Sequence, residues 1–129
     1  MVYCSGKGGR RMVLFRPVGT EELALIRASG YTAYPPRLPW QPIFYPVLEE
    51  EYAIEIAAGW NAACNDDHRG YVTRFELDDA YARQFEAHTV GAARHRELWV
   101  PAEELDTFNR HICGRIEVIH AFCQNAAGR

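Results

Sequence analysis

The sequence lacks any long apolar run, and no stretch approaches the roughly 18 to 20 residues that a membrane-spanning helix requires. Residues 1–11 contain Lys7, Arg10 and Arg11 but lack the apolar middle of a secretory signal. We therefore expect no membrane span, and we predict that residues 1–11 form a disordered extension.

Closely spaced cysteines are also lacking. The four cysteines, Cys4, Cys64, Cys113 and Cys123, form no C-x-x-C motif, and the histidines are scattered at positions 68, 88, 95, 111 and 120. Structural zinc sites need clustered ligands, so no metal is predicted. Without a secretory signal, the cysteine pattern favours free thiols and a cytoplasmic location.

Several common catalytic motifs are missing. Gly6-Lys7-Gly8-Gly9 lacks the spacing of a phosphate-binding loop and has no strand before it. There is no G-x-S-x-G, no H-E-x-x-H and no G-x-G-x-x-G following a strand. These absences disfavour the familiar serine hydrolases, zinc proteases and Rossmann dinucleotide sites.

The folded part of the chain is acidic. The formal charge is -3, from 14 basic and 17 acidic residues. Setting aside the three basic residues of positions 1–11 leaves 11 basic residues against 17 acidic ones, a net charge of -6. Without a basic stripe, binding to nucleic acid through its phosphates is disfavoured, whereas a small anionic ligand in a local basic pocket stays possible.

Strand and helix patterns alternate along 129 residues, the usual size of one domain. Strands are predicted at 13–18, 42–48, 70–77, 94–100 and 115–122, and helices at 20–29, 49–61, 79–85 and 101–113. Thr20 and Asp78 are predicted N-caps, and Gly30 and Gly114 are predicted helix ends. Residues 86–93 are predicted to form a loop.

These patterns predict an α+β fold with a single domain. Short, alternating strands favour a curved mixed or antiparallel sheet of about five to six strands with three to four helices, rather than a buried parallel sheet. The domain is expected over residues 12–123, with a frayed tail over residues 124–129.

Two stretches stand out as candidate site elements. Residues 31–41 contain Tyr34-Pro35-Pro36-Arg37-Leu38-Pro39-Trp40, which is either a stiff surface loop or a preorganised wall of a ligand cleft. Residues 94–101 place Glu97 beside His95 and between Arg94 and Arg96. Glu97 is either a site carboxylate or one half of an ion pair with Arg94 or Arg96. Arg16 is likewise either a site residue or one half of an ion pair with Glu117 or Glu76.

Several segments together resemble a family of small bacterial proteins labelled "ADP-ribosylation/crystallin J1". The resemblance spans roughly residues 12–122 and is carried by the segments at 14–19, 35–39, 41–48, 60–61, 70–75, 97–105 and 108–109. The element order is similar to that of compact mono-ADP-ribosyltransferases, so the resemblance implies an ADP-ribosyltransferase-like fold. Two departures are the missing S-T-S triplet and Arg96-Glu97 in place of a Q/E-x-E pair.

The resemblance implies NAD as the substrate that this site would bind. Glu97 would be the catalytic carboxylate, stabilising the cationic charge that develops as nicotinamide leaves. Arg16 would hold the dinucleotide, and Phe44 or Tyr45 would stack on nicotinamide. Thr73 and His95 complete the predicted cofactor-binding set.

Three functions follow as hypotheses. The first is transfer of ADP-ribose from NAD to an unknown protein or nucleic-acid target. The second is a non-catalytic ligand- or partner-binding module that uses the same cleft. The third is a hydrolase that acts on a nucleotide-like substrate. The transferase hypothesis requires Arg16, Tyr45 and Glu97 to line one cleft.

Overall fold

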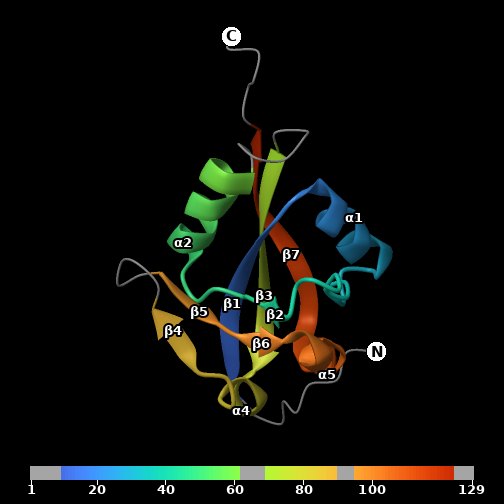
Figure 1. Ribbon diagram of the computed structural model, residues 1–129, viewed down its shortest axis with the longest axis vertical. Helices are drawn as coiled ribbons and strands as arrows, with labels where there is room; N and C mark the ends of the chain where they lie inside the picture. Colours follow the sequence, from blue (N-terminus) through green and yellow to red (C-terminus); the bar gives the residue numbers. More distant parts are fainter. Residues whose placement is uncertain (1–9, 62–68, 90–94, 124–129) are drawn as a thin grey trace.

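A computed structural model describes residues 10–61, 69–89 and 95–123. The chain is α+β, and its centre is an antiparallel sheet in the order β1-β3-β7 (Figure 1). The three strands are β1 (Arg11–Val18), β3 (Arg69–Asp78) and β7 (Ile112–Cys123). The prediction of an α+β fold is confirmed, and these three sheet strands pair antiparallel.

The sheet continues beyond β1 through Val47. The backbone N–H of Phe15 donates to the Val47 carbonyl at 2.9 Å, and that of Val47 donates back at 2.7 Å. Val47 also bridges to Glu97 in β5 (Arg96–Leu98), which pairs with β4 (Ala87–Thr89). A separate pair joins β2 (Ile43–Phe44) to β6 (Val100–Pro101).

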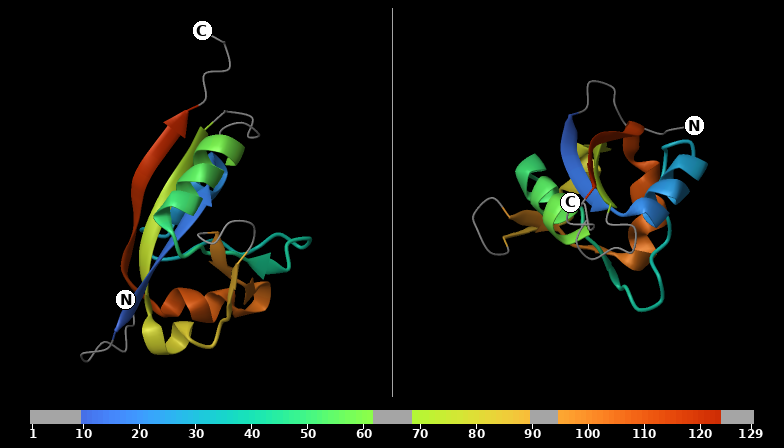
Figure 2. Two further views of the ribbon diagram at one scale, coloured as in Figure 1. Left: turned by 90° about the vertical axis from the view of Figure 1, so that its left-hand side faces the viewer. Right: turned by 90° about the horizontal axis from the view of Figure 1, so that it is seen from above.

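Helices cover both faces of the long strands (Figure 2). On one side lies α1 (Thr20–Ala28), and on the other lies α2 (Glu50–Glu55), which continues as the π-helix η1 (Ile56–Asn61). At one end lie α4 (Asp79–Ala82), the 3₁₀ turn η2 (Ala102–Glu104) and α5 (Leu105–Arg110).

Two apolar clusters form, one on each face of the sheet. The larger contains Leu14 and Val18 of β1 together with the rings of Tyr34, Phe44, Phe75 and Phe108. The smaller contains Phe15, Val47, Val72 and the α2–η1 alanines Ala53 and Ala57. Because side chains alternate across a strand, β1 contributes to both clusters. Both faces of the sheet are therefore buried near β1, and Val72 of β3 is fully buried in the smaller cluster.

Several predicted boundaries are confirmed. Gly30 ends the α1 region with a left-handed φ of 77°, a conformation that glycine adopts without steric cost. Asp78 caps α4, because its carboxylate accepts from the Tyr81 N–H at 3.2 Å. The helix predicted from residue 20 does begin there, but Gly19 occupies the N-cap position, so the assignment of Thr20 as the cap is wrong.

Other boundaries are corrected by pairing that the local pattern did not show. The strand predicted at 42–48 is reduced to β2 and the Val47 bridge, because Pro42 and Pro46 have no N–H to donate. Residues 87–89 form β4 instead of a loop. The last long helix ends at Arg110, and Gly114 (φ 78°) lies inside β7, near a register shift against β3.

The predicted limits of the domain shift slightly at its start. Arg11 already belongs to β1, and the Arg10 carbonyl accepts from the Asp79 N–H at 3.0 Å. Residues 1–9 and 124–129 lie outside the described residues.

Cys113 is disulfide-bonded and Cys123 is free and exposed, so the expectation that all cysteines are free thiols is wrong at Cys113. In the described ranges, every helix is too short or too polar to cross a bilayer.

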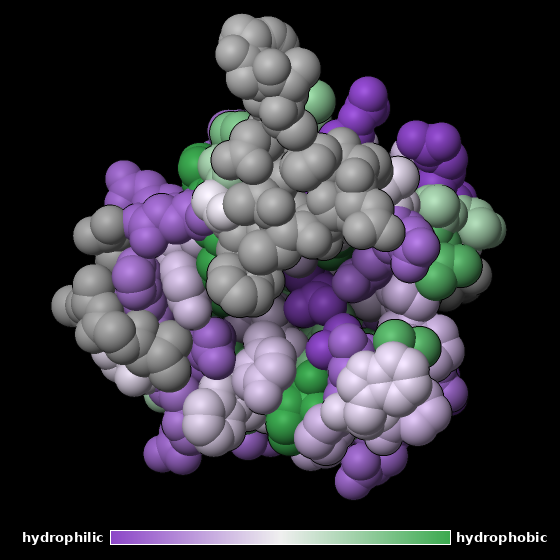
Figure 3. All heavy atoms as spheres, turned by 45° about the horizontal axis from the view of Figure 1, so that its top comes forward, coloured by the Kyte–Doolittle hydropathy of each residue, from purple (hydrophilic) through white to green (hydrophobic). Residues whose placement is uncertain are grey.

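The surface is mixed in character. Figure 3 shows one face on which hydrophilic spheres predominate and green apolar areas are small. The exposed large apolar and aromatic side chains among the described residues are Val13, Leu25, Leu38, Trp40, Tyr45, Trp99 and Val118. Four of these, Leu38, Trp40, Tyr45 and Trp99, come from the segments around β2 and β5.

Candidate functional site

The predicted site residues divide between the two faces of the sheet. Arg16 shares its face of β1 with Leu14 and Val18, which belong to the larger cluster. Glu97 is bridged through Val47 to Phe15, and directly paired residues project to the same face. Phe15 and Val47 belong to the smaller cluster, beneath α2. The structure therefore does not bring Arg16 and Glu97 into one cleft.

Arg16 is buried and engaged by an unpredicted partner. Its Nε and Nη2 donate to the two carboxylate oxygens of Glu22 on α1, at 2.7 and 3.0 Å. Its Nη1 donates to the Tyr45 carbonyl at 3.3 Å, and its guanidinium carbon lies 4.6 Å from the centre of the Phe44 ring. Burial by itself lowers the pKa of Arg16, but the Glu22 carboxylate outweighs burial and the pKa is raised. The alternative pairing with Glu117 or Glu76 is wrong.

Thr73 and Phe44 support Arg16 from within the core. The Thr73 hydroxyl donates to the Arg16 carbonyl at 2.7 Å and lies 2.8 Å from the hydroxyl of Tyr34. Because the Thr73 hydrogen is used, the Tyr34 hydroxyl is the donor in the second bond. Burial raises the pKa of Tyr34 well above its usual value. Thr73 and Phe44 are both fully buried, so they position neighbouring groups and do not reach the surface.

The other predicted residues gather around Glu97. Its two carboxylate oxygens accept hydrogen bonds from the Tyr52 hydroxyl at 3.2 Å and from the Trp99 indole N–H at 2.9 Å. Burial, followed by the charge of Glu97, raises the pKa of Tyr52 to about 12, so the hydroxyl is protonated at neutral pH. Glu97 is thus a half-buried carboxylate held between two aromatic side chains.

Two histidines stack against those aromatic side chains. The His95 ring is stacked on Tyr52, with ring centres 4.4 Å apart, and its Nε2 lies 2.9 Å from a carboxylate oxygen of Glu55. His88 is the cross-strand partner of Glu97 and stacks on Trp99 at 3.9 Å. We call the residues Tyr52, His88, His95, Glu97 and Trp99 the Glu97 cluster.

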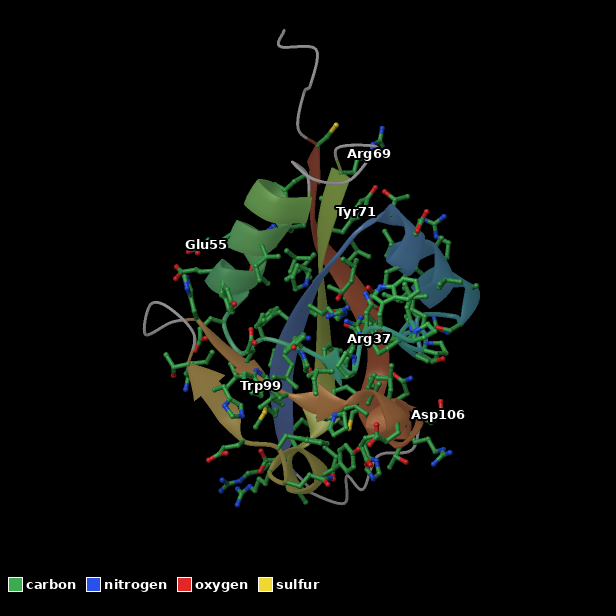
Figure 4. All side chains as sticks on the ribbon, viewed as in Figure 1. Arg37, Glu55, Arg69, Tyr71, Trp99 and Asp106 are labelled. Carbon is green, nitrogen blue, oxygen red and sulfur yellow. The ribbon has the colours of Figure 1, made fainter. Side chains whose placement is uncertain are left out.

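Tyr45 lies between the two groups of residues. Its carbonyl accepts from Arg16, whereas its exposed ring meets Trp99 edge-on with ring centres 6.3 Å apart. Figure 4 shows Glu55 and Trp99 on the α2 and β5 side of β1, and Arg37 on the side toward α1. The backbone of Tyr45 therefore contacts Arg16, and its ring contacts Trp99 of the Glu97 cluster.

The predicted ion pair of Glu97 with Arg96 is also wrong. The Arg96 side chain turns to Glu49, at the N-cap of α2, and its Nε donates to that carboxylate at 2.7 Å. Arg94, the other expected partner, lies outside the described residues. Among the described residues, no Arg, Lys or His forms an ion pair with Glu97 (the described ion pairs all involve other carboxylates).

Sequence reasoning missed Glu22, Tyr52, His88 and Trp99 as members of these groups. Trp99 follows Glu97 by two positions, a spacing that places both on the same side of an extended chain. That signal was available. Glu22 and Tyr52 come from helices, and their approach to the sheet depends on how each helix is rotated against it. Among the described residues, no three side chains are grouped as a metal site would require.

Comparison with known proteins gives no match among protein-family models, curated proteins or solved structures. The resemblance to the ADP-ribosylation/crystallin J1 family therefore stays a prediction.

Proposed function

We propose that this protein is a non-catalytic binding module that holds a cationic group of its ligand against the Glu97 carboxylate. The observation that carries the proposal is the setting of Glu97, which accepts hydrogen bonds from two neutral donors and has no cationic partner among the described residues. The two donors hold this carboxylate in one orientation, and neither donor brings a positive charge to it.

The aromatic neighbours favour an organic cation. Ammonium and guanidinium groups are attracted both to a carboxylate and to the faces of Trp and Tyr rings. The Trp99 and Tyr45 side chains are 42% and 40% exposed, so a ligand reaches them from solvent. Stacking on His88 fixes the Trp99 ring, which reduces the side-chain entropy that binding would otherwise cost.

Transfer of ADP-ribose is the weaker proposal. It needs Arg16 and Glu97 to face the same NAD molecule, and these two side chains lie on opposite faces of the sheet. Arg16 is also occupied by Glu22 in a bidentate pair. The hydrolase hypothesis has no group of described residues that favours it.

The test is a titration with benzyltrimethylammonium, followed by Trp fluorescence and by amide shifts in NMR spectra. We expect saturable binding with shifts centred on Glu97 and Trp99. Glu97→Gln keeps the size and one of the two acceptor oxygens but removes the charge, so affinity should fall roughly fivefold to tenfold. Glu103→Gln, at an exposed carboxylate of η2, is the matched control and should bind like the wild type.

Two results would overturn the proposal. Equal affinity of the wild type and Glu97→Gln would show that the carboxylate does not contact the cation. Equal binding of neutral benzyl alcohol would show that only the apolar group is recognised. Millimolar NAD that raises the melting temperature of the wild type, but not of Arg16→Ala or Glu97→Gln, would instead favour the transferase.

A further inference from the structure

A second polar group lies away from the Glu97 cluster, at the proline-rich loop. Arg37 follows Pro35 and Pro36, and its Nε donates to the Ile43 carbonyl at 3.1 Å across the loop. The neighbouring prolines restrict the backbone before Arg37, and this bond holds the Nε side of its guanidinium group. The Nη1 and Nη2 groups have no acceptor within the described residues, and they form the free edge of a rigid fork.

The positive charge of Arg37 is incompletely compensated. The guanidinium carbons of Arg16 and Arg37 lie 4.6 and 5.9 Å from the centre of the same Phe44 ring. Glu22 is the only carboxylate that the described contacts give to this pair, and it is bound to Arg16. Burial, followed by the charge of Arg16, lowers the pKa of Arg37. Two guanidinium groups and one carboxylate leave a net charge of about +1 at this point of an acidic chain.

We propose that the free edge of Arg37 binds a carboxylate whose attached body is apolar or aromatic. A planar carboxylate matches a guanidinium edge with two parallel N–H···O bonds. One negative charge neutralises the local excess, whereas a phosphate dianion would need a second available cation, and Arg16 is already paired.

The turn that follows Arg37 supplies the apolar contact. Leu38 and Trp40 are 49% and 73% exposed. Their turn is closed by two hydrogen bonds between Leu38 and Gln41, one from backbone to backbone at 2.8 Å and one from the Leu38 N–H to the Gln41 side chain at 3.0 Å. The turn therefore presents exposed apolar side chains one and three residues after Arg37, without first having to become ordered.

The experiment uses the full chain and three probes: phenylacetate, acetate and inorganic phosphate. Binding is followed by the NMR signal of the Arg37 side-chain Nε–H. We expect phenylacetate to shift this signal saturably and acetate to bind more weakly. Arg37→Ala should weaken phenylacetate roughly tenfold or more, because two charge-assisted hydrogen bonds are lost. Arg37→Lys keeps the charge but loses the fork, and it should fall between the wild type and Arg37→Ala.

Controls separate this site from its surroundings. Arg83→Ala removes an exposed arginine that pairs with Asp79 on α4 and should bind phenylacetate like the wild type. Trp40→Ala should weaken phenylacetate and leave acetate unchanged. Glu97→Gln should leave phenylacetate unchanged, which makes this test independent of the Glu97 proposal. Absence of a saturable shift in the wild type, or tighter binding of phosphate than of phenylacetate, would overturn the inference.

Discussion

At the scale of single residues, the pair of Arg16 and Glu22 is sensitive to the loss of either partner. The Arg16 and Glu22 side chains are 10% and 21% exposed, and the guanidinium makes two short bonds to the carboxylate. Breaking a buried ion pair on one side leaves an uncompensated charge in a poorly solvated place. This costs far more than the loss of an exposed pair.

We therefore predict that Glu22→Gln lowers the free energy of unfolding by on the order of 3 kcal/mol. Denaturant unfolding followed by circular dichroism measures the change. Glu21→Gln, on the exposed face of the same helix turn, is the matched control and should change the free energy by less than about 0.5 kcal/mol. Similar effects of the two substitutions would contradict the structural role given to Glu22.

Residue-scale reasoning from sequence was partly successful. It selected Arg16 and Glu97 as unusual charges on strands, and both are held by specific contacts. It gave them the wrong ion-pair partners, because it considered charges nearby in sequence or across neighbouring strands. Arg16 pairs with Glu22, and Glu97 accepts a hydrogen bond from Tyr52. Both of these partners come from helices.

At the scale of elements, two glycines offer a matched comparison. Gly30 follows α1 with φ 77°, whereas Gly59 lies within η1, and a Cβ at either position would meet no atom within 4 Å. A substitution at either site therefore tests backbone conformation without a steric clash. At Gly30 the left-handed backbone disfavours any residue with a Cβ, and at Gly59 the helical backbone disfavours glycine itself.

We predict that Gly30→Ala lowers the free energy of unfolding by about 1 kcal/mol. Gly59→Ala should raise it by up to about 1 kcal/mol, because alanine loses less backbone entropy in a helix. Thermal and denaturant unfolding of the two variants measure both signs. A stabilised Gly30→Ala would show that residue 30 does not need the left-handed conformation.

Elements were predictable where their pattern is local. The helix at 20–29 and the strands at 13–18 and 70–77 were predicted within a few residues. The helix has an acidic first turn and a glycine at its end, and the strands have alternating side chains, so each signal lies within its own segment. β4 was missed because residues 87–89 have no apolar alternation of their own, and they are extended by pairing with β5. The helix before β7 was predicted too long because Gly114 was interpreted as its end.

At the scale of the whole molecule, one carboxylate of the central sheet has a pKa that is lowered in the folded state. Glu76 on β3 accepts from Arg11 on β1 at 3.2 Å and from Arg74 at 3.3 Å. The bond from Arg11 is the largest influence and holds the pKa of Glu76 below its ordinary value of 4.5. A carboxylate with a lowered pKa in the folded state stabilises the fold above its unfolded pKa. That stabilisation is lost as the pH falls through the folded pKa.

We predict that Arg11→Ala reduces the acid dependence of the free energy of unfolding. The difference between wild type and Arg11→Ala should be largest near pH 7 and should shrink progressively as the pH falls below 4.5. Urea unfolding at a series of pH values measures it. Arg27→Ala is the control, since Arg27 bonds to the Tyr31 hydroxyl and to no carboxylate among the residues that the structure describes, and its effect should not change over this range. A constant difference for Arg11→Ala would contradict the role assigned to Glu76.

The sequence by itself determined the α+β class, the principal elements and the residues that carry unusual charge. These properties follow from local patterns, since side-chain periodicity and the backbone limits of glycine and proline act over a few residues. Only the tertiary structure decided that Arg16 and Glu97 face opposite sides of the sheet. That outcome depends on the pairing of β1 through Val47 to β5, and on α1 and α2 covering different faces. Contacts of this kind join residues distant in the chain, and no local pattern encodes them.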